Sequence, residues 1–103
     1  MYSGKLKEDL LDKLFEAILV LKNIDECYQF FEDLCTVAEL KSLAQRLEVA
    51  KMLGENLTYG EITKWTGAST ATISRVKRSL NYGADGYKLV LDRLVLSNKK
   101  GFL

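Results

Sequence analysis

The side chains best suited to contact a polyanion lie close together in one stretch of this 103-residue chain. Small and hydroxylated side chains stand in its middle, with cations before and after them. The set consists of Lys64, Ser69, Thr70, Ala71, Ser74, Arg75, Lys77 and Arg78. Lysine and arginine bind phosphate oxygens, whereas small and hydroxylated side chains can approach base edges. This composition predicts a surface that contacts both the backbone and the bases of duplex DNA.

The signals for two short helices and a turn surround these residues. Thr58 and Glu61 form a capping box, in which each side chain can bond the backbone amide of the other, so a helix should begin just after Thr58. Gly67 can adopt a positive φ and turn the chain sharply. Ser69 can then cap a second helix. Residues 57–80 therefore have the layout of a helix-turn-helix.

An apolar seam between the two predicted helices supports this layout. The positions that a helix-turn-helix buries hold Ile62, Ala68, Ile73 and Val76. Thr63 and Thr66 occupy positions where small or apolar residues are more common. On the second helix, Thr70, Ala71 and Ser74 should face base edges, while the cations mostly meet phosphates. A plain helical hairpin with a solvated basic face is the competing interpretation.

Charge is distributed unevenly along the chain, although the formal net charge is only +1. Residues 1–61 contain twelve acids against seven lysines and arginines. Residues 62–84 contain four bases and no acid, and residues 85–103 contain four bases and two acids. Positive potential is therefore concentrated on the predicted helix-turn-helix, as expected of a protein that contacts a phosphate backbone.

The first helix that periodicity predicts covers residues 5–21, and it is apolar on so broad an arc that one packing partner cannot cover it. A short helix capped by Asp25 and dense in aromatic side chains should follow. The chain is 48% hydrophobic but short, so one copy would bury its apolar surface poorly. Both features predict that a second copy covers the first helix in a homodimer.

The third predicted helix starts at a second capping box, Thr36 and Glu39, and stops at Gly54. Its inward face should hold Val37, Leu40, Leu43, Ala44, Leu47 and Ala50. A last helix over residues 86–96 should cover exposed core. The predicted organisation is one all-helical domain over residues 1–96, with a dimerisation core at 1–56, the helix-turn-helix at 57–80, the C-terminal helix at 86–96 and a frayed tail at 97–103.

Composition disfavours several classes of site. The chain has no histidine, and Cys27 and Cys35 are its only cysteines, so it lacks the groups for an ordinary metal site and for the usual acid–base or nucleophilic catalysis. We therefore expect no metal and no enzyme. The N-terminal apolar run at residues 17–21 is too short to span a bilayer, and no secretory segment is evident. We expect a reduced, cytoplasmic protein without membrane contact; a disulfide is the alternative for the two thiols.

Two segments, TVAELKSLAQRLEVAKML and GASTATISRVKRSL, are similar to the tryptophan repressor family, and in particular to its branch of small repressor-like proteins from Gram-positive bacteria with unassigned ligand. The resemblance covers residues 34–94. It implies an all-α, six-helix subunit whose N-terminal helices interlock with those of a second subunit in a homodimer. That dimer would present two recognition helices to successive major grooves, with half-sites roughly 34 to 36 Å apart.

The resemblance also implies a pocket that, in the family, holds tryptophan between the core and the helix-turn-helix. The matching residues are Thr36, Arg46, Arg75 and Ser79, with the two arginines in the places that flank the indole. Where the family has a glycine after the second arginine, this chain has Val76, which should fill volume that the ligand needs. We therefore expect that no cofactor is required; a small corepressor is the alternative, and tryptophan is disfavoured. Thr36 can also act only as a cap, and Arg46 can also pair with an acid.

These features predict a transcriptional regulator that binds double-stranded DNA sequence-specifically, a repressor that acts as a dimer on a palindromic operator. The alternative is a helical, dimeric protein-interaction module whose helix-turn-helix docks an acidic partner. Salt-dependent binding to random duplex DNA separates the two, because only the regulator requires it.

Overall fold

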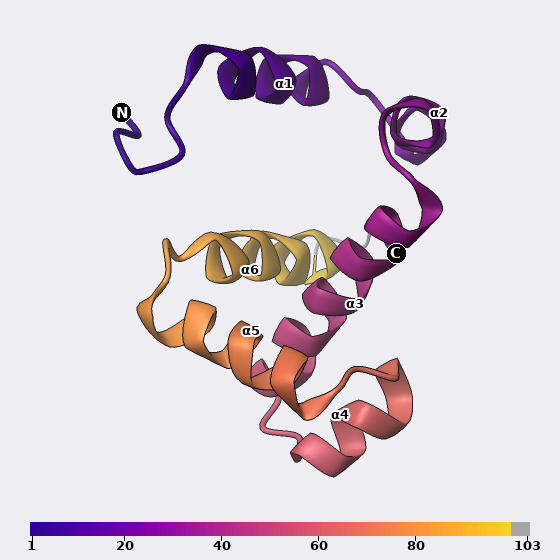
Figure 1. The fold of residues 1–103 in the computed structure, drawn as a ribbon, viewed down its shortest axis with the longest axis vertical. Helices are drawn as coiled ribbons and strands as arrows, with labels where there is room; N and C mark the ends of the chain where they lie inside the picture. The colour runs from indigo at the N-terminus through magenta and orange to yellow at the C-terminus, as the bar shows by residue number, and fades with distance from the viewer. Residues whose placement is uncertain (100–103) are drawn as a thin grey trace. The chain divides into compact units, whose positions relative to one another are not determined.

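The computed structural model describes residues 1–99 of the chain (Figure 1). This range contains six helices and no strand: α1 (Asp9–Leu19), α2 (Ile24–Leu34), α3 (Val37–Gly54), α4 (Tyr59–Thr66), α5 (Thr70–Tyr82) and α6 (Gly86–Lys99). The predicted all-α, six-helix class is confirmed. The chain divides into two compact units, an N-terminal unit, Met1–Leu40, and a C-terminal unit, Lys41–Leu103.

Helix α1 starts at Asp9, so the predicted span of residues 5–21 is too long. Asp9 and Asp12 occupy its first turn, where the positive end of the helix dipole stabilises carboxylates. A start at residue 5 would have placed two lysines in that turn instead. One of them, Lys7, forms an ion pair with Asp12 from outside the helix. The helix therefore begins where the charges of its first turn are favourable.

Helix α2 is capped by Asn23, and the prediction that Asp25 caps it is wrong. The Glu26 amide donates to Asn23 Oδ1 at 2.9 Å, and Glu26 Oε1 accepts from the Lys22 amide at 2.8 Å. Asp25 lies in the first turn of the helix. The spacing of an asparagine and a glutamate three residues apart is the sequence signal that identifies this start.

Helix α3 begins at its predicted capping box and ends at Gly54, as predicted. The Thr36 amide donates to Glu39 Oε1 at 2.8 Å, and the Glu39 amide donates to Thr36 Oγ1 at 3.1 Å. The hydrogen bond from the Thr36 backbone amide, and after it the Thr36 side chain, lower the pKa of the Glu39 carboxyl below its ordinary value. The carboxylate is thereby favoured at the positive end of the helix dipole.

The predicted inward face of α3 is wrong for one copy of the chain. Of its six residues, only Ala50 is buried and Leu40 is half-buried. The other four, Val37, Leu43, Ala44 and Leu47, are exposed. The buried residues of α3 are Val49, Ala50 and Met52.

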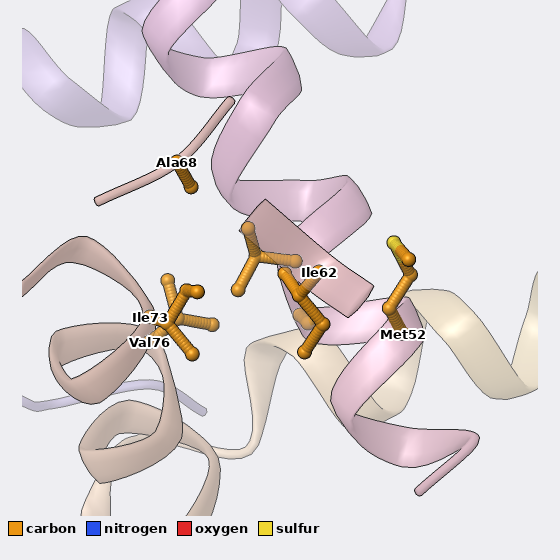
Figure 2. Packing of buried hydrophobic residues seen from close by; sticks show 7 residues of the cluster. Met52, Ile62, Ala68, Ile73 and Val76 are labelled. Atoms are coloured by element: carbon orange, nitrogen blue, oxygen red, sulfur yellow. The ribbon is translucent and has the colours of Figure 1, made fainter. Parts of the chain in front are cut away.

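The core of the C-terminal unit forms where α3, α4, the following turn and α5 meet (Figure 2). Its seven buried side chains are Val49, Ala50, Met52, Ile62, Ala68, Ile73 and Val76. Half-buried Leu53, Leu57, Tyr59, Leu80, Tyr87 and Leu91 pack against them. Because the last two belong to α6, that helix covers core as predicted. All four residues predicted for the helix-turn-helix seam are in this core, which confirms the seam.

The N-terminal unit has no comparable core. Neither α1 nor α2 contains a buried residue. Phe30 and Phe31 form an edge-to-face pair with ring centroids 5.4 Å apart. In contrast, Leu10, Leu19 and Ile24 are 74%, 82% and 73% exposed. The N-terminal unit by itself therefore buries little of its apolar surface.

Helix α6 starts at Gly86, as predicted, but it extends to Lys99. Residues 97–99 of the predicted frayed tail are thus helical, and residues 100–103 of that tail lie outside the described part of the chain. Before α6, the Gly83 amide donates to the Ser79 carbonyl oxygen at 2.9 Å and closes the end of α5. A Cβ on Gly83 would lie 2.3 Å from that oxygen, so this close approach requires glycine.

Candidate nucleic-acid interface

The reading head, residues 58–82, comprises α4, a turn and α5 (Figure 1). The Thr58 amide donates to Glu61 Oε1 at 3.0 Å, and the Glu61 amide donates to Thr58 Oγ1 at 3.2 Å. Gly67 follows α4 with a φ of 73°, in the left-handed region that favours glycine. Both the capping box and the glycine turn are confirmed.

Ser69 caps α5, as predicted. Its Oγ accepts a hydrogen bond from the Thr72 amide at 3.1 Å. The same hydroxyl lies 3.1 Å from the Thr72 hydroxyl and bonds it as well. Because both bonds hold the Ser69 side chain against the first turn, this hydroxyl fixes the start of the helix that carries six of the predicted contact residues.

All eight residues predicted to contact DNA are exposed. They are Lys64, Ser69, Thr70, Ala71, Ser74, Arg75, Lys77 and Arg78. On the other side of α5, Ile73 and Val76 are buried in the core. Within residues 1–99, Lys7 and Asp12 form the one ion pair, so none of these four cations is neutralised by an acid there. Their exposure is confirmed, while their contact with DNA stays a prediction.

Lys77 has a partner that the sequence does not predict. Its ammonium nitrogen lies 5.9 Å from the centroid of the Tyr59 ring on α4, within the range of a cation–π interaction. Tyr59 itself packs against the core. No spacing rule connects residues on two different helices, so the sequence offered no signal for this pair. The contact holds Lys77 near the start of α4.

Thr66 joins α3, α4 and the turn. Its hydroxyl donates to the Ile62 carbonyl oxygen at 2.7 Å and accepts from the Ala68 amide at 3.1 Å. Its carbonyl oxygen accepts a hydrogen bond from Gln45 Nε2 on α3 at 3.0 Å. All three bonds are partly buried. A hydroxyl residue directly before the turn glycine is a local signal for the first two bonds, whereas the sequence gives none for Gln45.

Glu61 is the one acid in the reading head. The hydrogen bond from the Thr58 backbone amide, and after it the Thr58 side chain, lower the pKa of the Glu61 carboxyl below its ordinary value. The carboxylate is thus used to cap α4. Residues 62–82, which follow it, carry only positive side-chain charges, which favours contact with an anionic ligand.

Two of the four residues predicted for a ligand pocket, Thr36 and Arg46, form hydrogen bonds with residues three or four positions away. Arg46 donates from Nη1 to Ser42 Oγ at 2.7 Å, so within residues 1–99 it pairs with a hydroxyl and the alternative of an acid partner is wrong. Arg75 and Ser79 are both exposed, one turn apart on α5. Thr36, in the N-terminal unit, caps α3. Within the C-terminal unit, no described hydrogen bond links Arg46, Arg75 and Ser79 to one another.

Val76, which stands where the family pocket has glycine, is 1% exposed and belongs to the core. Figure 2 shows it beside Ile73 in the cluster that also contains Ile62. A ligand that needed this space would have to displace a core side chain. The expectation that no cofactor is required stays a prediction.

Cys27 and Cys35 are free, half-buried thiols. Within residues 1–99, histidine, cysteine, aspartate and glutamate side chains form no group of three that could hold a metal ion. None of the helices in the described range is long and apolar enough to cross a membrane.

Known proteins resemble this chain over most of its length. A sequence model of the family described as Trp repressor protein matches residues 9–95. The uncharacterized protein YerC of Bacillus subtilis (strain 168) is 62% identical over 94 residues, which are 91% of this chain and 90% of YerC. The crystal structure of a candidate Trp repressor from Staphylococcus aureus has a TM-score of 0.83 and 61% identity, covering 86% of this chain and 89% of that one. A TrpR-like protein from Eubacterium eligens ATCC 27750 has a TM-score of 0.84 and 63% identity, covering 86% and 92%.

Proposed function

Because the chain belongs to the Trp repressor family, a family of regulatory DNA-binding proteins, we propose that it is a transcriptional regulator that binds double-stranded DNA through its reading head. One observation carries the proposal. Helix α5 buries Ile73 and Val76 against the core and exposes small and hydroxylated residues followed by cations. A helix built in this way can enter the major groove while its cations meet phosphates.

The exposed residues of α5 divide between two tasks in this proposal. Thr70, Ala71 and Ser74 face base edges, because they lie near the start of the helix and are small enough for close approach. Arg75, Lys77 and Arg78 of α5, together with Lys64 of α4, contact phosphates. The phosphate contacts supply most of the affinity, and the base contacts supply the sequence preference.

The regulator acts as a homodimer on a palindromic operator and represses transcription from it. The exposed apolar side chains of α1 and α2 support a dimer, because a second copy can cover a surface that one copy leaves in water. Two copies related by a two-fold axis present two α5 helices, which requires an operator with two-fold symmetry. Since Val76 occupies core space, the dimer requires no small ligand.

Replacement of Lys77 and Arg78 by alanine tests the proposal. The double variant should bind every duplex more weakly, and the slope of log affinity against log salt should flatten by about one unit for each lost phosphate contact. Lys88→Ala, on α6, is the matched control, because it removes a cation from outside the reading head. Binding is measured by fluorescence anisotropy over a series of salt concentrations.

An unchanged affinity and salt slope in the double variant would contradict the assignment of α5. If the wild-type protein bound no random duplex at any salt concentration, the protein-interaction alternative would be favoured instead. Trp65, which is 77% exposed on α4, is then the first side chain to replace in a search for a protein partner.

A further inference from the structure

One hydrogen bond ties the reading head to α3 over a long separation in sequence. Gln45 Nε2 donates to the Thr66 carbonyl oxygen at 3.0 Å, and the two residues are 21 positions apart. Every other side-chain hydrogen bond within residues 1–99 joins residues at most five positions apart. The Gln45 bond is therefore the one directional polar contact between α3 and the reading head in the described chain.

The position of the acceptor gives this bond its importance. Thr66 is the last residue of α4, and the last carbonyl groups of a helix have no partner within that helix. Gln45 supplies the missing donor. The Thr66 hydroxyl at the same time accepts from the Ala68 amide in the turn. The chain is thus fixed on α3 at the point where it leaves α4 and turns toward α5.

Apolar packing alone would fix this point less strictly. The contacts of Ile62 and Ala68 with the core are non-directional, so they limit the distance between helices more than their rotation. A hydrogen bond, in contrast, weakens steeply when its angle departs from linearity. Because α5 begins at Thr70, shortly after the fixed point, the bond constrains where α5 starts relative to α3.

We propose that Gln45 is a positioning residue, which holds the reading head in its DNA-binding orientation without help from a small ligand. This inference rests on the proposed function. The Gln45 side chain is neutral and half-buried, so the constraint is present at any pH and in the absence of any second molecule. Val76 also makes a ligand unnecessary in this proposal, since its side chain fills the core space on the buried side of α5.

The test compares Gln45→Met with wild type. Methionine keeps the length and helix propensity of glutamine but removes the donor. Affinity is measured for a duplex that the wild-type protein selects from a random library and for a random-sequence duplex of equal length. We expect affinity for the selected duplex to fall by about threefold to tenfold, the range for loss of one neutral hydrogen bond. Affinity for the random duplex should change less, because phosphate contacts do not need a fixed helix direction.

A second readout distinguishes positioning from general stability. The selected operator is altered by adding or removing one base pair between its half-sites. Wild type should discriminate sharply against the altered spacing, whereas Gln45→Met should discriminate less, because its reading heads are less constrained. Ser42→Ala is the matched control, since it removes the neighbouring hydrogen bond on α3, from Arg46, which does not reach α4.

The same measurements are made on Gln45→Glu, which also keeps the shape of the side chain. Its carboxylate places an acceptor, instead of a donor, opposite the Thr66 carbonyl oxygen. It remains informative if Gln45→Met does not fold. Wild-type affinity and spacing preference in the folded variants would overturn the positioning role while leaving the proposed function intact. If the wild-type protein itself failed to distinguish selected from random duplexes, that result would contradict the proposed function. The inference about Gln45 would then be contradicted as well, because it rests on that function.

Discussion

The two units of the chain differ in how they bury apolar side chains. All seven buried residues of the described part of the chain lie in the C-terminal unit, whereas α1 and α2 of the N-terminal unit bury none. Both units nevertheless contain amphipathic helices with apolar faces. An apolar face that its own chain does not cover is typical of a surface that binds another molecule. The reading head therefore rests on packing within its own unit, whereas the apolar faces of α1 and α2 are the surfaces that the proposed dimer would cover.

The largest effect, on dimer dissociation, is expected when a substitution introduces a charge into the N-terminal unit. Leu10 is 74% exposed on α1, so Leu10→Glu would be harmless in a monomer. If a second copy covers Leu10, an unpaired carboxylate is buried, and the dimer dissociation constant should rise by at least about a hundredfold. Sedimentation equilibrium measures this change. Lys13→Glu, on the same helix at an exposed polar position, is the control; equal masses for the two variants and wild type would contradict a dimer that covers Leu10.

A smaller effect is expected in the core of the C-terminal unit. Ile62→Ala on α4 removes a side chain that is 0% exposed, and it should lower the free energy of unfolding by about 2 to 5 kcal/mol. Trp65→Ala on the same helix removes a larger side chain that is 77% exposed, and it should cost about 0.5 kcal/mol or less. Urea unfolding followed by circular dichroism measures both. A larger loss for Trp65→Ala than for Ile62→Ala would show that the core is misplaced.

The smallest effect concerns the capping boxes, one in each unit. In both, hydrogen bonds from threonine lower the pKa of the folded-state carboxyl, at Glu39 and at Glu61. The resulting stability is fully present above the ordinary carboxyl pKa of about 4.3 and is lost as pH falls through the lowered, folded-state pKa. At neutral pH, Thr58→Ala should cost about 1 kcal/mol as the loss of a threonine cap. Thr36→Ala should show the same pattern in the N-terminal unit.

The pH dependence of these caps is read from melting temperatures. The difference in Tm between wild type and Thr58→Ala should narrow below about pH 4, because protonation removes the carboxylate that completes the box. A difference that stays constant from neutral to acidic pH would show that the Glu61 carboxylate contributes nothing to the cap. Thr36→Ala compared in the same way shows whether the caps of the two units behave alike.

Local signals predicted the reading head well. The pair of Thr58 and Glu61, the glycine at position 67 and the cap at Ser69 each act within a few residues, so spacing alone identifies them. The helical spacing of apolar residues also predicts the buried seam between α4 and α5. For the same reason, the start of α2 could have been found, since Asn23 and Glu26 show the same spacing.

Interactions between distant segments could not be predicted in this way. The periodicity of α3 identified an apolar stripe, but only the structure reveals that Leu43 and Leu47 are exposed and Val49 is buried. The period of the apolar residues predicts which face of a helix is apolar, but it does not predict which segment covers that face. The bond from Gln45 to Thr66 joins two helices, and no spacing in the sequence encodes it.

In the proposed function, two copies of this chain bind one palindromic duplex through α5. The most direct test titrates the protein into a duplex selected from a random library and follows the fluorescence anisotropy of the labelled DNA at several salt concentrations. We expect two chains bound per duplex and a log affinity that falls linearly with the logarithm of salt concentration. A stoichiometry of one chain per duplex, or an affinity independent of salt, would contradict the proposal.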